Sequence, residues 1–245
     1  MAKDDEKRAE LTEHLAELRT RLIRCAICVV VGAVVAWLFY DQLFSFLTRP
    51  MTQVLARIHS QFLLTSFPEA FLIQMQICII AGIILMSPLL TMEVWGFVAP
   101  GMTRQERKAI KWIAPLSIVL FACGVVLCYL ILPKAFNWFA SYIPKNAQLR
   151  PSVQQAVLFT VKMLLAFGIV FELPVVLMLL GKVGIVNSGM LARNWRYAMV
   201  AVCVVAAVAT PSNDAFSMLM MAIPVAGLYF MSIGLVKLTE RKRRF

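Results

Sequence analysis

The sequence predicts an all-α integral membrane protein with six transmembrane helices. Its composition, its apolar segments and the placement of its basic residues all support this class. Of 245 residues, 61% are hydrophobic and 15% are charged, against roughly 45–50% and 25% in soluble domains. The mean hydropathy is +0.80. Each membrane crossing takes about 20 residues plus a connection, so we expect residues 1–245 to form a single polytopic membrane domain.

Six apolar segments are the expected spans. They cover residues 22–40, 70–92, 112–132, 157–181, 197–209 and 216–236. The fifth extends only roughly 20 Å, whereas the hydrocarbon core measures about 30 Å. We expect the bilayer to thin beside it, or polar ends to be drawn inward. No cleavable signal peptide is expected, because the first segment continues into bulky Trp37, Phe39 and Tyr40.

The Lys and Arg residues are distributed unevenly among the connections. Eighteen of the 24 lie in the N-terminal region, after the second and fourth spans, or in the C-terminal tail; five lie in the other connections, and Lys162 lies inside the fourth span. Connections rich in basic residues stay in the cytoplasm, so both termini are predicted to be cytoplasmic. Residues 41–69 and 133–156 are then periplasmic loops, and residues 210–215 form a tight periplasmic turn.

The net charge of +11 does not indicate a nucleic-acid partner. The basic residues stand in short blocks beside apolar segments, where the anionic headgroups of the lipid bilayer are the expected neighbours. We find no sustained internal repeat, which disfavours a transporter built from inverted repeats.

The cysteines and histidines indicate no catalytic, metal or cofactor site. All six cysteines lie within predicted spans and are expected to be buried as small apolar residues. Cys25 and Cys28 form a CxxC, but no His follows it and no βαβ pattern surrounds it, so redox chemistry is disfavoured. His14 and His59 fall on opposite sides of the membrane and cannot share a metal. There is also no HExxH motif and no phosphate-binding GxxxxGK[ST] loop.

An amphipathic helix over about residues 8–21 is expected to run along the cytoplasmic interface into the first span. Leucines recur there at helical spacing: Leu11, Leu15, Leu18 and Leu22. Glu17 lies on this helix, just below the membrane. One interpretation is structural, in which Glu17 pairs with Arg21 at i,i+4 for a few tenths of a kcal/mol. The other is that Glu17 binds a cationic partner.

Glu106 also has two interpretations. Residues 103–106 read T-x-x-E shortly before an apolar run, which is typical of a capping box at the start of a helix. Like Glu17, however, Glu106 is predicted to lie on the cytoplasmic face among many cations. The two carboxylates could therefore form a cation-binding site.

Glu172 lies near the middle of the fourth span, ten residues from Lys182. A lone charged carboxylate at that depth costs about 2.5–3.5 kcal/mol on translocon scales, so such groups are normally protonated, paired or facing a wet cavity. A functional role is therefore favoured. Pro174 follows closely and is predicted to bend the helix near Glu172. Lys162, near the outer end of this span, is expected to extend to the headgroups.

Four stretches of the chain form recognisable motifs. They are HLAELRTRL at residues 14–22, SPLLTMEVWGFVAPGMTRQERK at 87–108, LLAFGIVFELPVVL at 164–177 and ATPSNDAFSM at 209–218. In order and spacing they strongly resemble the signatures of the TatC family, the receptor subunit of the twin-arginine protein translocase. The resemblance implies a concave, glove-shaped scaffold of six helices with a short fifth and sixth helix, and a protein that is not an enzyme.

The resemblance also implies a site for twin-arginine signal peptides. Glu17 and Glu106 match the two carboxylates that receive the paired arginines, and four residues belong to the surrounding motif: Arg19, Arg21, Phe97 and Pro100. A guanidinium offers a planar fork that a carboxylate can meet with two hydrogen bonds, whereas Lys is a hydrated point charge. Glu172 matches the family's intramembrane glutamate, which lines the concave face.

Further matches point to the periplasmic side and to partner docking. The matching residues are Pro50, Pro68, Glu69, Thr210 and Asp214. Where the family usually has TPPDxxSQ before the sixth helix, this chain has TPSNDAFSM, with one extra residue and Met218 in place of Gln. It also has Gln74 and Gln76 where the family often has a basic residue.

The expected function is therefore that of a signal-peptide receptor and core scaffold in a bacterial or archaeal inner membrane. The resemblance implies export of folded proteins driven by the proton motive force, with single-helix TatA- and TatB-type partners and a homo-oligomeric complex. One alternative is a proton-coupled small-solute transporter that uses Glu172 as its proton carrier. The other is a scaffold without receptor activity, in which Glu17 and Glu106 are purely structural.

Overall fold

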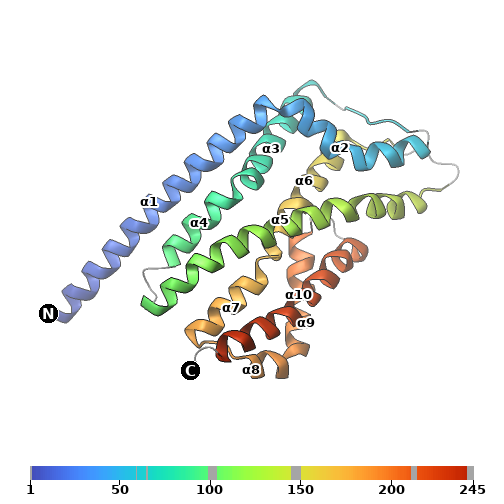
Figure 1. Ribbon diagram of the computed structural model, residues 1–245. Helices are drawn as coiled ribbons and strands as arrows, with labels where there is room; N and C mark the ends of the chain where they lie inside the picture. Colours follow the sequence, from blue (N-terminus) through green and yellow to red (C-terminus); the bar gives the residue numbers. More distant parts are fainter. Residues whose placement is uncertain are drawn as a thin grey trace.

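The computed structural model describes residues 2–58, 60–64, 66–98, 104–144, 150–210 and 214–241, with backbone alone for residues 2–14, 98, 104–113, 239 and 241. The described chain is almost entirely helical (Figure 1). Its helices are α1 (Ala2–Leu38), α2 (Tyr40–Arg57), α3 (Phe67–Leu85), α4 (Ser87–Val98), α5 (Arg104–Ser141), α6 (Val153–Val170), α7 (Leu173–Val183), α8 (Ser188–Arg193), α9 (Trp195–Ala209) and α10 (Ala215–Arg241). The all-α prediction is confirmed.

Within the described residues, five helical segments are long and apolar enough to cross a membrane. They are Leu15–Leu38, Phe67–Leu85, Ala114–Ser141, Val153–Val183 and Ala215–Leu238. The predicted fifth span corresponds to α9, an apolar helix of 15 residues. This is shorter than the roughly 17–25 residues of an ordinary span, so the count of six spans stays a prediction.

Two predicted periplasmic loops are partly helical in the structure. The segment 41–69 contains α2, an 18-residue helix that buries Leu47, Met51 and Val54 on one face. Pro50 lies inside α2, where it leaves the carbonyl of Phe46 without its helical donor. The hydroxyl of Tyr129 on α5 donates to that carbonyl at 3.1 Å. Tertiary packing therefore stabilises a helix that the sequence pattern did not predict. The second loop, 133–156, also loses its first residues to α5, which continues to Ser141.

Two of the long apolar segments are interrupted. The span predicted as continuous over residues 70–92 is divided at Met86 into α3 and α4. Pro88 follows the break and cannot donate a helical hydrogen bond. The second interruption, at Phe171 and Glu172 between α6 and α7, was predicted from Pro174, and that bend is confirmed.

The helices pack as two connected groups. Helix α1 lies along α3 and α4, while α10 packs on α7, α8 and α9. Helices α5 and α6 join them, because α6 contacts α3 and α5, and α5 contacts α4 and α7 (Figure 1). The largest buried cluster centres on this joint and includes Ile77, Val157, Phe167 and Met221. The start of α1 and the end of α10 lie toward the same end of the molecule, opposite α2 (Figure 1).

Helices α1 and α3 approach each other closely at two glycines. A Cβ atom on Gly82 would lie 2.5 Å from the backbone nitrogen of Ala33, and one on Gly32 would lie 2.6 Å from the carbonyl oxygen of Gly82. Only glycine allows backbones to approach this closely, as in other membrane helix pairs. This contact sets the position of α1 against the α3–α4 segment.

Candidate functional site

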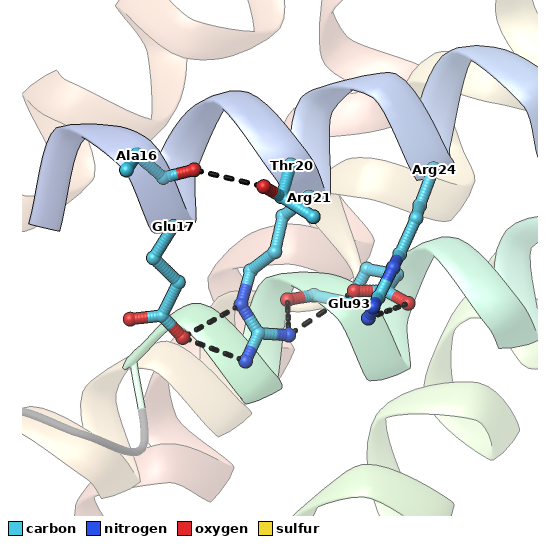
Figure 2. A network of polar contacts seen from close by, with 6 residues as sticks. All are labelled: Ala16, Glu17, Thr20, Arg21, Arg24 and Glu93. Carbon is cyan, nitrogen blue, oxygen red and sulfur yellow. Dashed lines mark hydrogen bonds and ion pairs between the residues drawn. The ribbon is translucent and has the colours of Figure 1, made fainter. Parts of the chain in front are cut away.

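A network of ion pairs links α1 to α4 near the N-terminal end of the molecule (Figure 2). Its centre is Arg21. The Nε and Nη2 groups of Arg21 donate to Oε1 of Glu17 at 3.0 and 2.8 Å. The predicted i,i+4 pairing of Glu17 with Arg21 is therefore confirmed.

Glu93 on α4 is the second acceptor for Arg21. The Nη1 group of Arg21 donates to Oε2 of Glu93 at 3.1 Å and lies 3.5 Å from its backbone carbonyl oxygen. Arg24 approaches the other carboxylate oxygen of Glu93, with Nη1 at 3.8 Å (Figure 2). Gly96 leaves room for this arrangement, since a Cβ there would lie 2.3 Å from Nη1 of Arg21.

These side chains are partly accessible to solvent. The exposed fraction is 31% for Glu17 and 22% for both Arg21 and Glu93, whereas Arg24 is 60% exposed. A carboxylate in such a position can exchange one cation for another, because it is neither sealed in the core nor fully hydrated. The geometry also suits guanidinium, since Glu17 already accepts two hydrogen bonds from one.

The other residues predicted for this site have different outcomes. Arg19 is exposed on α1 and does not take part in the network of Figure 2. Phe97 is half-buried near the end of α4. Pro100 lies outside the described residues, as does the side chain of Glu106, whose backbone is in the first turn of α5. The distance between Glu17 and Glu106 therefore stays untested.

A second polar group lies inside the apolar part of the molecule. The hydroxyl of Ser117 on α5 donates to Oε2 of Glu172, and the same hydroxyl accepts a hydrogen bond from the Trp95 indole nitrogen at 3.3 Å. The three residues come from α4, from α5 and from the junction of α6 and α7. Around them, Leu120 and Val175 form part of a small apolar cluster that includes Trp95.

The break between α6 and α7 positions Glu172. Its backbone nitrogen donates to the carbonyl of Ile169 at 3.1 Å, and its own carbonyl accepts from the backbone nitrogens of Val175 and Val176. The new helix therefore starts directly after Glu172, with Pro174 in its first turn. The carboxylate oxygen Oε1 of Glu172 is buried and has no hydrogen-bond partner in the structure.

Comparison with known proteins places this arrangement in a family. Residues 13–224 match the model of the family described as Sec-independent protein translocase protein (TatC). The chain belongs to the TatC family. It is 38% identical over 238 residues to the Sec-independent protein translocase protein TatC of Xylanimonas cellulosilytica, covering 96% of this chain and 86% of that protein. The TatC protein of Desulforapulum autotrophicum is 39% identical over 234 residues, with 95% and 86% covered.

A solved structure shares the fold. The crystal structure of a twin-arginine translocase receptor, TatC, superposes with a TM-score of 0.80 at 32% identity, covering 93% of this chain and 99% of that one. This TatC-family chain is therefore a component of the Sec-independent protein translocase and a multi-pass protein of the inner membrane. The relatives are named as translocase proteins rather than as enzymes.

At the α2 end of this TatC-family chain, Glu69 joins two connections. Its side chain accepts from the backbone nitrogen of Ser66 at 3.2 Å, which is half of a capping box at the start of α3. Its other oxygen accepts from the hydroxyl of Ser152 at 2.9 Å. Beside it, Leu63 and Ser152 form an isolated β-bridge. These contacts of Glu69, Leu63 and Ser152 hold the connection before α3 against the start of α6. Pro68 is exposed in the first turn of α3.

The residues before α10 act locally in the structure. Asp214 accepts a hydrogen bond from the backbone nitrogen of Ser217 at 2.7 Å and thus caps the start of α10. Thr210 is buried, and its backbone nitrogen donates to Ala206 at the end of α9. Their predicted part in partner docking stays untested.

Three functional candidates escaped the sequence analysis: Glu93, Ser117 and Trp95. Glu93 and Trp95 lie within the motif at residues 87–108. A carboxylate in an otherwise apolar helix was the available signal for Glu93. For Ser117 there was none, because a single Ser in a span ordinarily bonds to its own helix. Among the described residues, no three His, Cys, Asp or Glu side chains could jointly hold a metal.

Proposed function

We propose that this TatC-family protein is the twin-arginine signal-peptide receptor and core scaffold of a translocase that exports folded proteins. One observation carries the proposal. Glu17, partly exposed on α1, already holds a guanidinium group through two hydrogen bonds. A site with this geometry suits the side chain that defines a twin-arginine signal.

The recognition chemistry follows from the shapes of the two basic side chains. Arg presents a rigid planar fork, and each carboxylate can meet it with two parallel hydrogen bonds. Lys presents a compact and strongly hydrated charge that cannot form the same pair. With Glu106 as the second carboxylate, the site accepts two adjacent arginines and discriminates against two lysines.

The apolar part of the signal then inserts along the concave face, past Glu172. Its partner Ser117, and Trp95 which bonds to Ser117, are neutral, so this carboxylate offers a polar point in an apolar surface rather than an ion pair. In this proposal both termini and the Glu17 site face the cytoplasm, as the distribution of basic residues predicts.

Helix α9 provides the docking surface for single-helix TatA- and TatB-type partners. Its 15 residues extend roughly 22 Å, so the bilayer thins beside it and other short helices gather there. Val200, Val204 and Val208 leave one apolar face of α9 exposed. Several copies of the chain assemble with these partners, and the proton motive force drives transport.

The alternative of a proton-coupled small-solute transporter is not favoured. The relatives and the solved structure that resemble this chain are named as protein translocase components. Proton carriers in transporters are chains of ionisable groups, whereas Glu172 accepts from the Ser117 hydroxyl, which itself accepts from the Trp95 indole.

Neutralising the receptor carboxylates tests the proposal. Purified full-length protein in lipid nanodiscs is titrated with a fluorescent twin-arginine signal peptide and with its twin-lysine counterpart. Glu17→Gln and Glu106→Gln are each expected to weaken twin-arginine binding by roughly 10- to 100-fold, the value of a charge-assisted hydrogen bond of about 1.5–3 kcal/mol. Glu106→Gln would keep the capping box predicted from the sequence, because Gln also serves at that position.

Glu240→Gln is the matched control. Glu240 lies on α10 and accepts hydrogen bonds from Ser188, so its change removes one negative charge without touching the Glu17 site. Equal binding by wild type, Glu17→Gln and Glu106→Gln would refute the receptor assignment. Equal weakening by Glu240→Gln would assign the effect to general charge instead.

A further inference from the structure

In the structure, the carboxylate that is proposed to receive a signal arginine is already occupied. Both hydrogen bonds from Arg21 to Glu17 end on one oxygen, Oε1. The other oxygen points away from Arg21 (Figure 2). A foreign guanidinium therefore cannot pair with both oxygens of Glu17 until Arg21 withdraws.

We propose that Arg21 is an internal competitor for the incoming arginine, and that Glu93 receives Arg21 when the signal binds. This inference rests on the proposed function and adds a regulatory step to it. Arg21 and Glu93 then act as positioning residues, since neither needs to touch the signal peptide. They set how much of the receptor presents a free Glu17.

The geometry supports Glu93 as the receiving group. One guanidinium nitrogen of Arg21 is already bonded to Oε2 of Glu93 at 3.1 Å, so the exchange begins from a shared state. The second oxygen, Oε1, is engaged only loosely, by Arg24 at 3.8 Å. When Arg21 leaves Glu17, the guanidinium nitrogens that are freed can bond to Oε1 of Glu93.

The backbone also favours a mobile Arg21 head group. Gly96 lies directly beneath it, and no side chain there blocks the movement of the guanidinium across α4. All three central side chains are partly exposed, so water and a ligand can reach the exchange. The open oxygen of Glu17 gives the signal arginine a first contact, after which the two guanidinium groups exchange.

The consequence is a tunable apparent affinity. A ligand that binds only the form with a free Glu17 has an apparent dissociation constant raised by the inverse of that form's population. Removing Arg21 raises this population. Neutralising Glu93 lowers it, because among the described side chains Arg21 then has Glu17 alone as a carboxylate partner.

A double-mutant cycle separates this idea from simpler ones. The variants are Arg21→Met, Glu93→Gln and the two combined, in full-length protein in nanodiscs, with the same twin-arginine peptide. Arg21→Met is expected to tighten binding about 2- to 5-fold, and Glu93→Gln to weaken it by a similar factor, the range of partly exposed ion pairs. In the double variant, the loss of affinity caused by Glu93→Gln is expected to disappear, because Arg21 is no longer there for Glu93 to receive.

Several results would overturn the inference. If Glu93→Gln weakens binding equally with and without Arg21, Glu93 either contacts the signal directly or supports the fold. If Arg21→Met weakens binding, Arg21 orients Glu17 rather than competing for it. If Arg21→Met does not fold, as judged by thermal unfolding, Arg21→Lys serves instead and is expected to tighten binding less, since an ammonium holds Glu17 by a single point of charge. Unchanged or weaker binding by that variant overturns the proposal.

The same titrations distinguish failure of the inference from failure of the proposed function. If wild type binds the twin-arginine peptide no better than the twin-lysine peptide, the receptor role fails and the competition falls with it. If wild type discriminates between the peptides but the cycle is additive, the receptor role stands and only the competition is refuted.

Discussion

The two polar regions of this protein use the same residue type in opposite ways. Between α1 and α4, Glu17 and Glu93 both face Arg21, and these three side chains are between a fifth and a third exposed. Inside the bundle, the one described hydrogen-bond partner of the Glu172 carboxylate is the hydroxyl of Ser117, which in turn accepts from Trp95. The first region is an exchangeable set of ion pairs, and the second is a fixed chain of hydrogen bonds whose donors are neutral side chains.

The difference follows from where each carboxylate lies. Near water, an ion pair costs little to break because solvent can replace either partner. In an apolar interior, a donor that is removed is not replaced, and the polar atom left behind costs about 1–3 kcal/mol. We therefore expect changes in the first region to alter ligand binding, and changes in the second to alter stability.

The largest effect is expected where the backbones of α1 and α3 touch. In Gly82→Val, the new Cβ would lie 2.5 Å from a backbone atom of α1, which cannot rotate away. The helices must separate, at a cost of about 3 kcal/mol or more. Because α1 carries Glu17 and Arg21, binding of the twin-arginine peptide should be lost together with the stability, measured by thermal unfolding in nanodiscs.

Gly227→Val is the control for this change. Gly227 is on α10, and a Cβ there would have no neighbour within 4 Å. This variant should leave peptide binding unchanged. If Gly82→Val binds the peptide and unfolds as wild type does, the contact of α1 with α3 does not position the ion-pair network.

An intermediate effect is expected for Ser117→Ala. The change removes the hydroxyl that Glu172 and Trp95 share, which should lower the unfolding free energy by about 1–3 kcal/mol. Ser232→Ala is matched in burial, but its hydroxyl donates only to the carbonyl of Leu228 in its own helix. Ser232→Ala should lower the unfolding free energy less than Ser117→Ala does. Equal losses would show that the hydrogen bonds through Ser117 contribute no extra stability.

The smallest effect is expected for Gly96→Ala. The new methyl group meets the flexible end of Arg21 at 2.3 Å, so the guanidinium shifts instead of the backbone. Gly→Ala within a helix ordinarily gains about 0.5–1 kcal/mol, and Gly227→Ala should show this gain in full. Gly96→Ala should gain less stability and, by hindering the transfer of Arg21 to Glu93, weaken twin-arginine binding about twofold. A gain equal to that of Gly227→Ala, with unchanged binding, would contradict this account of Arg21.

Much of the fold could be predicted because its signals are local. The apolar segments, the bend before Pro174 and the pairing of Glu17 with Arg21 each depend on residues a few positions apart. Helix α2 was missed because Pro50 normally interrupts a helix, and the hydroxyl that compensates for it belongs to Tyr129 on another helix. The break at Met86 was missed although Pro88 was available as a signal.

By itself, the sequence determined that this chain is an apolar helical membrane protein with a carboxylate just before its first predicted span and another in its interior. Only the tertiary structure decided which partners those carboxylates meet. Arg21 and Glu93 are 72 positions apart, and Ser117 and Glu172 are 55 positions apart. Hydropathy and helical spacing carry no information over such separations, because contacts between distant helices depend on how closely their backbones can pack, here set by Gly32 against Gly82 and by Gly96 beneath Arg21.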